Sequence, residues 1–268
     1  MTDTRETHLV KLGGSLITDK TRPETHRAEV IERLAAEIRQ ASDDRSLIVG
    51  HGSGSFGHVA ASESGIHRGV IDPAQISGIS TTQGQAFKLH QIVVTALRTA
   101  GVAAYSVVPS SCVFAKAGQP DQIWPDPLMT ALRLGLVPVV FGDVVMDRDW
   151  GASICSTEAL FLALAPALGS RGTFVRRVVW LGETDGVLDA DGQTIPEILT
   201  TELPDLMAGL EGAAGTDVTG GIRHRLESAG VLAQQGIGSW IGDGRRPGAL
   251  MAGLTDTAQD GTRVLPGR

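Results

Sequence analysis

The chain has 268 residues, of which 42% are hydrophobic and 20% charged, as in ordinary globular proteins. A formal net charge of -7 and an aromatic content of 4% argue against a general nucleic-acid binder, which needs a basic surface or stacking platforms. No apolar stretch reaches membrane-spanning length, the start MTDTRETH is no signal peptide, and Cys112 and Cys155 stand apart without metal-binding spacing, so we expect a soluble cytoplasmic protein.

Apolar runs alternate with helical patterns along the whole chain. Short apolar runs predict strands at 8–12, 46–50, 103–108, 136–142, 174–182, 238–242 and 262–265. Helical patterns are found at 26–41, 75–100, near 126–135, at 157–168 and from about 220 onward, and the stretch 183–218 is the least regular. Uniformly apolar strands between helices indicate an α/β fold, a three-layer sandwich with a largely parallel central sheet. No linker or repeat divides the chain, so we expect a single domain over 1–268.

The stretch HGSGSFGH (51–58) follows the second predicted strand and spaces its glycines as G-x-G-x-x-G. It could be a dinucleotide fingerprint with Asp72 as its acid, a protein-kinase glycine loop, or a tight turn that binds nothing. The kinase motifs VAIK, HRD and DFG are missing, and no Gly-Lys pair exists for a Walker A loop. The dinucleotide reading stays a minor alternative, because its fingerprint usually opens the first strand-helix unit.

Two other glycine turns carry cations. In KLGGSLITDK (11–20), Lys11 and Lys20 bracket a Gly-Gly-Ser turn, although the chain otherwise favours arginine. In DVTGGIRHRLES (217–228), a helix is expected to begin near Gly220, with Arg223, His224 and Arg225 in its first turn. Cations there oppose the helix dipole at roughly 0.3–1 kcal/mol each, whereas a bound anion would reverse the sign. The glycine turns at 13–14 and 52–57, Asp143 and the stretch 182–186 follow predicted strands, where open parallel sheets bind ligands, so a phosphate site is expected there.

Together, Lys11-x-Gly-Gly-Ser, HGSGSFGH, Gly-Asp-Val-Val (142–145) and DVTGG resemble the amino-acid kinase superfamily and, more narrowly, the isopentenyl phosphate kinases. The most specific piece is Ser55-Phe56-Gly57-His58, because relatives acting on carboxylates lack that histidine. The resemblance implies an amino-acid-kinase type of sandwich, with an acceptor-side lobe at about 1–170 and a nucleotide-side lobe at about 171–268. It implies transfer of the γ-phosphoryl group of ATP to isopentenyl phosphate, with Mg²⁺, by a cytoplasmic homodimer.

The same resemblance assigns residues to roles. Lys11, Lys20 and His58 would be catalytic, Lys20 by stabilising the transition state and His58 by donating to the acceptor phosphate. The residues expected on ATP are Lys11, Gly13, Gly14, Ser15, Gly54, Asp185, Gly221 and Arg225. Those expected on the acceptor are Ser53, Gly54, His58 and Thr157. No metal ligand is assigned, and His51, just before the turn, is expected to order the loop.

The chain departs from the family pattern in three places. The family's Ser-Gly-Asp-Asp reads Ser156-Thr157-Glu158-Ala159, Thr-Asp-Val-Asp-Gly reads 182–186 GETDG, and Gly-Lys-Lys reads 223–225 RHR. Two alternatives therefore stay open beside the isopentenyl phosphate kinase. One is a related kinase acting on a phosphonate, as fosfomycin resistance kinase does, or on another alkyl phosphate. The other is a nucleotide-binding regulator with weakened catalysis.

Overall fold

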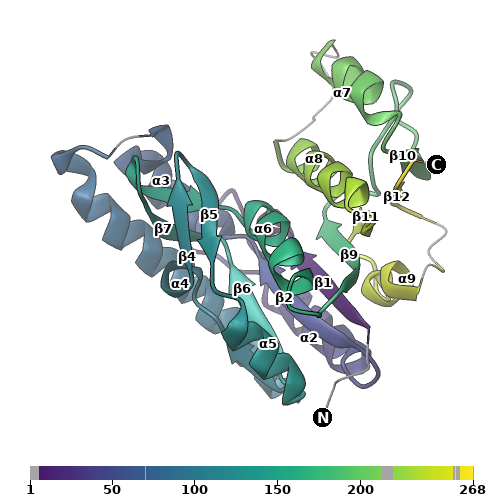
Figure 1. The fold of residues 1–268 in the computed structure, drawn as a ribbon, viewed down its shortest axis with the longest axis horizontal. Coiled ribbons are helices and arrows are strands. Elements are labelled where there is room, and N and C mark those ends of the chain that lie inside the picture. The colour runs from purple at the N-terminus through teal and green to yellow at the C-terminus, as the bar shows by residue number, and fades with distance from the viewer. Residues whose placement is uncertain (1–5, 70, 213–219, 256, 258–259, 268) are drawn as a thin grey trace.

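The protein is described by a computed structural model that covers residues 6–69, 71–212, 220–255, 257 and 260–267. Its centre is an eight-stranded sheet in the order β10-β12-β11-β9-β1-β2-β6-β3 (Figure 1). All its neighbouring strands are parallel except β11 and β12. The strands are β1 (Thr7–Leu12), β2 (Ser46–His51), β3 (Ala104–Ser106), β6 (Val137–Phe141), β9 (Val175–Gly182), β10 (Glu197–Leu199), β11 (Gly238–Asp243) and β12 (Thr262–Leu265). The predicted α/β fold with a largely parallel sheet is confirmed.

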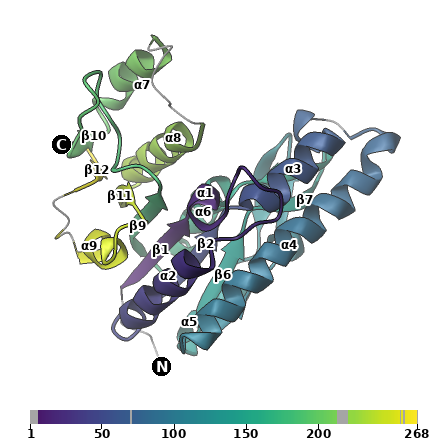
Figure 2. The same cartoon turned by 180° about the vertical axis from the view of Figure 1, so that it is seen from behind.

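Helices cover both faces of this sheet. Figure 1 looks onto the face that carries α5 (Asp126–Arg133), α6 (Thr157–Gly169) and α8 (Gly220–Gln234). Figure 2 looks onto the opposite face, with α2 (Ala28–Ala41), α4 (Ile76–Thr99) and α9 (Ala249–Thr255). No helix in the described part of the chain combines the length and the apolar character needed to cross a membrane.

The alternation of side chains along each strand decides which helices a residue meets. In β1, Leu9 belongs to the core beneath α6 and α8, whereas Val10 and Leu12 belong to the core beneath α2 and α4. Lys11, in phase with Leu9, therefore points toward α6 and α8, because successive side chains point to opposite faces. In β2, Ile48 lies on the α6 face while Val49 lies on the α4 face, so His51 points toward α4.

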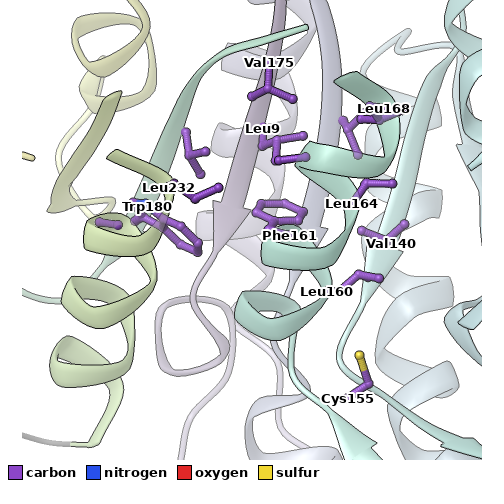
Figure 3. Packing of buried hydrophobic residues seen from close by; sticks show 14 of the residues in the cluster. Leu9, Val140, Cys155, Leu160, Phe161, Leu164, Leu168, Val175, Trp180 and Leu232 are labelled. Atoms are coloured by element: carbon purple, nitrogen blue, oxygen red, sulfur yellow. The ribbon is translucent and has the colours of Figure 1, made fainter. Parts of the chain in front are cut away.

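Large apolar side chains hold α6 on the sheet (Figure 3). Phe161, Leu164 and Leu168 are fully buried against Leu9 and its neighbours. The rings of Phe161 and Trp180 are 5.8 Å apart between centroids, which ties α6 to β9. Each such side chain contributes roughly 1.5–3 kcal/mol through burial, so α6 is firmly placed on the sheet.

Beside the main sheet, a second sheet has the order β5-β4-β7-β8. It consists of β4 (Val113–Lys116), β5 (Gln119–Ile123), β7 (Asp143–Asp147) and β8 (Gly151–Cys155). The sequence did not predict this sheet as such. The stretch described as least regular contains β10 and the helix α7 (Leu203–Gly212). Asp72 caps the short helix Pro73–Gln75 by accepting from the Ala74 N–H at 2.7 Å, so the dinucleotide interpretation that used it as an acid is wrong.

Candidate active site

The glycine turns after β1 and β2 lie back to back. They open the helices α1 (Gly14–Ile17) and α3 (Gly54–Ser64). A Cβ on Gly14 would lie 2.7 Å from the Gly54 nitrogen, and Gly54 has a φ of +49°. Thr18 joins the turns, since its hydroxyl donates to the Gly14 carbonyl at 2.7 Å and accepts from the Ser55 N–H at 3.0 Å. The glycines are needed first for this close contact of two backbones.

Lys11 and Glu158 form a buried ion pair at the end of β1. Lys11 is 5% exposed, and its ammonium donates to the carboxylate of Glu158, in the first turn of α6. Burial lowers the pKa of Lys11 and the Glu158 charge opposes this, while Arg225 and Lys20 lower it further. Burial disfavours the ionised Glu158 carboxyl, yet the charge and hydrogen bond of Lys11 hold its pKa below the usual value. Glu158 had no predicted role beyond its departure from the family pattern, so this partner of Lys11 was missed.

Arg225 is a buried cation contributed by α8. It extends from α8 beneath Gly182, is 5% exposed, and its Nε and Nη1 have no hydrogen-bond partner among the described residues. Burial lowers its pKa, and the charges of Glu158 and Glu183 oppose this shift. A buried cation with unpaired N–H groups is costly unless an anion completes it. The geometry therefore favours a bound anion between Arg225 and the turns after β1 and β2.

The other cations predicted at the start of α8 turn outward. Helix α8 begins at Gly220, as expected, and Gly221 lies next to the guanidinium of Arg225. Arg223 donates to Glu227 at 2.9 Å, and the exposed His224 lies 3.8 Å from the same carboxylate. Of the three predicted cations, only Arg225 faces the interior. Residues 217–219 of the DVTGG motif lie outside the described residues.

Lys20 and His58 are exposed and lie near Lys11. Lys20 lies in a loop braced by the Asp19 N–H, which donates to the Thr25 carbonyl at 2.8 Å. His58 lies on the first turns of α3, and partial burial followed by the charges of Lys20 and Lys11 lowers its pKa, against the effect of Glu158. The imidazole is therefore neutral at physiological pH, and one of its nitrogens donates.

Thr157 has a supporting contact in place of the predicted contact with the acceptor. It is 1% exposed, and its hydroxyl donates to the His51 carbonyl at 2.7 Å. Ser156 caps α6 by accepting from the Ala159 N–H at 3.1 Å, which explains the serine before the helix. Thr157 thus ties α6 to β2 and leaves Glu158 as the residue of this turn that reaches Lys11.

Asp185 and Asp143 already have protein partners. Asp185 pairs with Arg246 at 2.8 Å, and Arg246 also pairs with Asp260 at 2.6 Å. These three residues line a hollow of about 180 Å³ beside Trp240. Asp143 accepts from the Ser110 N–H at 2.9 Å and from its neighbour Val144, and burial raises its pKa. Asp143 therefore fixes the turn at 109–111.

The residues around Lys11, Glu158 and Arg225 do not fit a magnesium ion held by protein groups. Among the described residues, no three His, Cys, Asp or Glu side chains are placed to share a metal ion. Glu158 is paired with Lys11, and Glu183 with Arg27 at 2.5 Å. Mg²⁺ prefers oxygen ligands and is commonly held by substrate phosphates, so no step is assigned to a protein-bound ion.

Comparisons with known proteins agree with this geometry. The model of the amino acid kinase family matches residues 6–243. The isopentenyl phosphate kinase of Methanothermobacter thermautotrophicus is 33% identical, covering 96% of this chain and 98% of the relative. That of Haloferax volcanii is 35% identical over 91% of this chain and 98% of its own length.

A solved structure described as that of isopentenyl phosphate kinase superposes with a TM-score of 0.79 at 29% identity, covering 96% of this chain and 100% of the other. The product complex of the Thermoplasma acidophilum enzyme gives a TM-score of 0.76 at 25% identity, with 96% and 99% covered. The fold, the paired glycine turns and the family match lead to one conclusion: this chain is a member of the amino acid kinase family.

Proposed function

We propose that this protein transfers the γ-phosphoryl group of ATP to isopentenyl phosphate, giving isopentenyl diphosphate and ADP. The observation that carries the proposal is the unpaired, buried Arg225 beside the Lys11–Glu158 pair, next to the paired glycine turns. Such a constellation lacks an anion. The relatives of similar length are named for this reaction, which supports the choice of acceptor.

The ATP phosphates lie, in this proposal, where the first glycine turn meets Arg225. Gly14 and Ser15 offer backbone N–H groups at the start of α1, while the N–H of Gly13 donates to the Leu181 carbonyl at 2.8 Å and holds the turn against β9. Lys11 and Arg225 supply positive charge beneath the turn. Gly221 allows the chain to pass close to Arg225, and Asp185 lies on the nucleotide side, at the hollow beside Trp240. The nucleotide-side residues after about 170 thus complete a site begun by the first half of the chain.

The acceptor phosphate lies over the second turn. Gly54 is placed beneath the transferring group, and Ser53 and His58 face the non-reacting oxygens of the acceptor. An ionised phosphate is itself the nucleophile, so no general base is required. Lys20 neutralises the charge on the phosphoryl group between donor and acceptor. Mg²⁺ would be held by the phosphates of ATP and would neutralise part of their charge, because the cationic side chains Lys11, Lys20 and Arg225 offer it no ligand.

The direct test is ADP release with a panel of alkyl phosphates and phosphonates at saturating ATP. Turnover with isopentenyl phosphate and little with the others is the expected result. Turnover with phosphonates alone would mean that the acceptor is a phosphonate and not isopentenyl phosphate. ATP binding without turnover would contradict the proposal and indicate a nucleotide-binding regulator.

We propose in addition that the enzyme acts as a cytoplasmic homodimer, as its family resemblance implies. Light scattering of the purified protein should then give twice the chain mass of 28.0 kDa. A mass of one chain would contradict the dimer without affecting the assigned chemistry.

A further inference from the structure

Behind the acceptor turn, two buried histidines and a serine form a continuous series of hydrogen bonds. His51 Nδ1 lies 3.0 Å from the Gly52 carbonyl, and His51 Nε2 lies 3.1 Å from Nδ1 of His90 on α4. His90 Nε2 lies 2.6 Å from the hydroxyl of Ser106 on β3. We call these three residues, His51, His90 and Ser106, the histidine relay.

The Gly52 carbonyl determines every proton position in the histidine relay, because the Ser106 hydroxyl at the other end can either donate or accept. The Gly52 carbonyl can only accept, so His51 Nδ1 must carry a proton and donate. In a neutral ring the other nitrogen then accepts, which makes His90 Nδ1 the donor to His51 Nε2. His90 Nε2 is left as the acceptor of the Ser106 O–H. Both imidazoles are therefore Nδ1–H tautomers.

The surroundings keep both rings neutral. His51 and His90 are 0% and 1% exposed, and His90 stacks on Phe141 with ring centroids 4.3 Å apart. Burial lowers the pKa of His51 to about 4 and that of His90 to about 3, the latter with small contributions from His51 and Arg98.

We propose that the histidine relay sets the orientation of the Gly52–Ser53 peptide so that the Ser53 N–H is held ready for the acceptor phosphate. In a trans peptide the C=O and the N–H point in opposite directions. His51 draws the Gly52 carbonyl toward the α4 face, so the Ser53 N–H points away from that face. This N–H makes no hydrogen bond within the described part of the chain. The three residues are positioning residues, and their assigned role at the acceptor depends on the proposed function.

The first test reads the tautomers directly by NMR of the ¹⁵N-labelled imidazoles in the substrate-free protein. His51 and His90 should both carry the proton on Nδ1, the less common neutral tautomer, and should not titrate between about pH 6 and 8. Signals are assigned through their loss in His51→Asn and His90→Asn. A proton on Nε2 of either ring would overturn the histidine relay, whatever the enzyme phosphorylates.

The second test compares two replacements of His90. His90→Phe keeps a ring stacked on Phe141 but removes the donor to His51, and it should raise the KM for the acceptor about 10-fold, the value of roughly one buried hydrogen bond. His90→Asn keeps an N–H donor at the same distance from the backbone and should recover much of this loss. The KM for ATP should change less than about twofold in both variants. A role in packing alone predicts the reverse order, with Phe milder than Asn, and that order would overturn the proposal.

Ser106→Ala provides a milder variant at the far end of the histidine relay, with Ser106→Thr as its matched control. Loss of the hydroxyl removes the donor to His90 Nε2, so NMR should show a shift of this unprotonated nitrogen in Ser106→Ala and a much smaller one in Ser106→Thr, while the proton stays on Nδ1 in both. A His90 proton that moves to Nε2, or an Nε2 signal that does not respond to loss of the hydroxyl, would contradict the proton assignment. If the wild-type protein shows both Nδ1–H tautomers but no turnover of isopentenyl phosphate, the proposed function fails while the proton assignment stands. Binding of isopentenyl phosphate, followed by calorimetry, then decides whether the acceptor is still recognised through Ser53.

Discussion

The two faces of the central sheet support the glycine turns after β1 and β2 in opposite ways. On the α6 and α8 face, the ends of the elements carry buried charges, namely Lys11, Glu158 and Arg225. On the α4 face, the glycine turn after β2 rests on the neutral rings of His51 and His90. The two arrangements lie close together: Lys11 in β1 pairs with Gly50 in β2, and the next residue of β2, His51, points to the opposite face.

This difference suggests a division of labour. The buried cations Lys11 and Arg225 have part of their charge neutralised by Glu158, and in the proposed function they attract the strongly charged ATP phosphates. Neutral hydrogen bonds set a backbone geometry without adding charge, so the other side can orient a smaller phosphate. The proposed site therefore combines electrostatic attraction from the α6 and α8 face with a fixed backbone geometry from the α4 face.

Removing the negative member of the charged side should have the largest effect. Glu158→Gln leaves Lys11 and Arg225 facing each other without an anion, and we expect the free energy of unfolding to fall by about 3 kcal/mol. Saturating ATP should restore part of this loss, since its phosphates replace the missing charge. Urea unfolding with and without ATP measures both effects.

Glu183→Gln is the matched control for that variant. It breaks the ion pair of Arg27 and Glu183, whose side chains are 36% and 30% exposed, and it should cost less than about 1 kcal/mol. Equal losses in the two variants would mean that the Lys11–Glu158 pair is no more important than a surface pair.

Lys20→Ala tests the exposed positive charge near Lys11. Its ammonium acts on charge that develops during transfer, so kcat should fall on the order of 10²–10³-fold while the KM for ATP changes little. Since the side chain is exposed, the free energy of unfolding should not change. Steady-state kinetics beside Lys116→Ala, another exposed lysine, checks this. An unchanged kcat would remove Lys20 from the active site.

The sequence predicted the main sheet because its strands are apolar runs that need no partner to be recognised. Elements at 104–106, 137–141 and 175–182 fall inside predicted runs. The sheet formed by β4, β5, β7 and β8 was missed because its strands are short, and β5, read QPDQI, is polar and contains a proline. Segment β10 has three residues and is stabilised mainly by pairing with β12, which no local pattern reveals.

At the site, the sequence indicated residue types and could not indicate directions. Lys11 and the glycine turns were found because their spacing is local. Glu158 was overlooked because its partner is 147 residues away, and only strand alternation together with the position of α6 joins them. For the same reason Thr157 was placed on the acceptor, although the fold turns its hydroxyl toward the His51 carbonyl. His90 lacked any local motif.

As the pH falls, the stability contributed by the neutral histidines His51 and His90 should be lost before that contributed by the Lys11–Glu158 pair. The pKa of His90 is about 3 in the folded protein against 6.5 for an unperturbed imidazole, so below pH 6.5 the unfolded chain binds more protons. The stability associated with the neutral ring is complete above pH 6.5 and declines as the pH falls toward 3. Between about pH 8 and pH 5 this amounts to roughly 2 kcal/mol.

His90→Phe lowers the free energy of unfolding relative to the wild-type protein, and this difference should therefore be about 2 kcal/mol smaller at pH 5 than at pH 8. For Glu158 the sign differs, since its lowered pKa adds stability that is lost only as the pH falls below 4.5 through the folded value. The loss in free energy of unfolding caused by Glu158→Gln should thus be nearly equal at pH 5 and pH 8. A pH-independent result for His90→Phe would show that its ring is not kept neutral by the fold.

His58 gives the smallest and most specific test, because it lies where the two sides meet. As a neutral donor to an ionised acceptor it should lower the KM without affecting ATP, and because the ring is exposed the effect is limited. His58→Ala should raise the KM for isopentenyl phosphate about 10-fold, with some loss of kcat, at the low end for a hydrogen bond to a charged group. His58→Gln, which keeps an N–H donor, should recover part of the loss. Because the pKa of His58 is lowered, the wild-type KM should not change between about pH 7 and 9, where the ring stays neutral and still donates. Kinetics of the three proteins at saturating ATP provide the measurement, and wild-type behaviour of His58→Ala would show that the acceptor phosphate lies elsewhere and that the neutral side ends at the glycine turn.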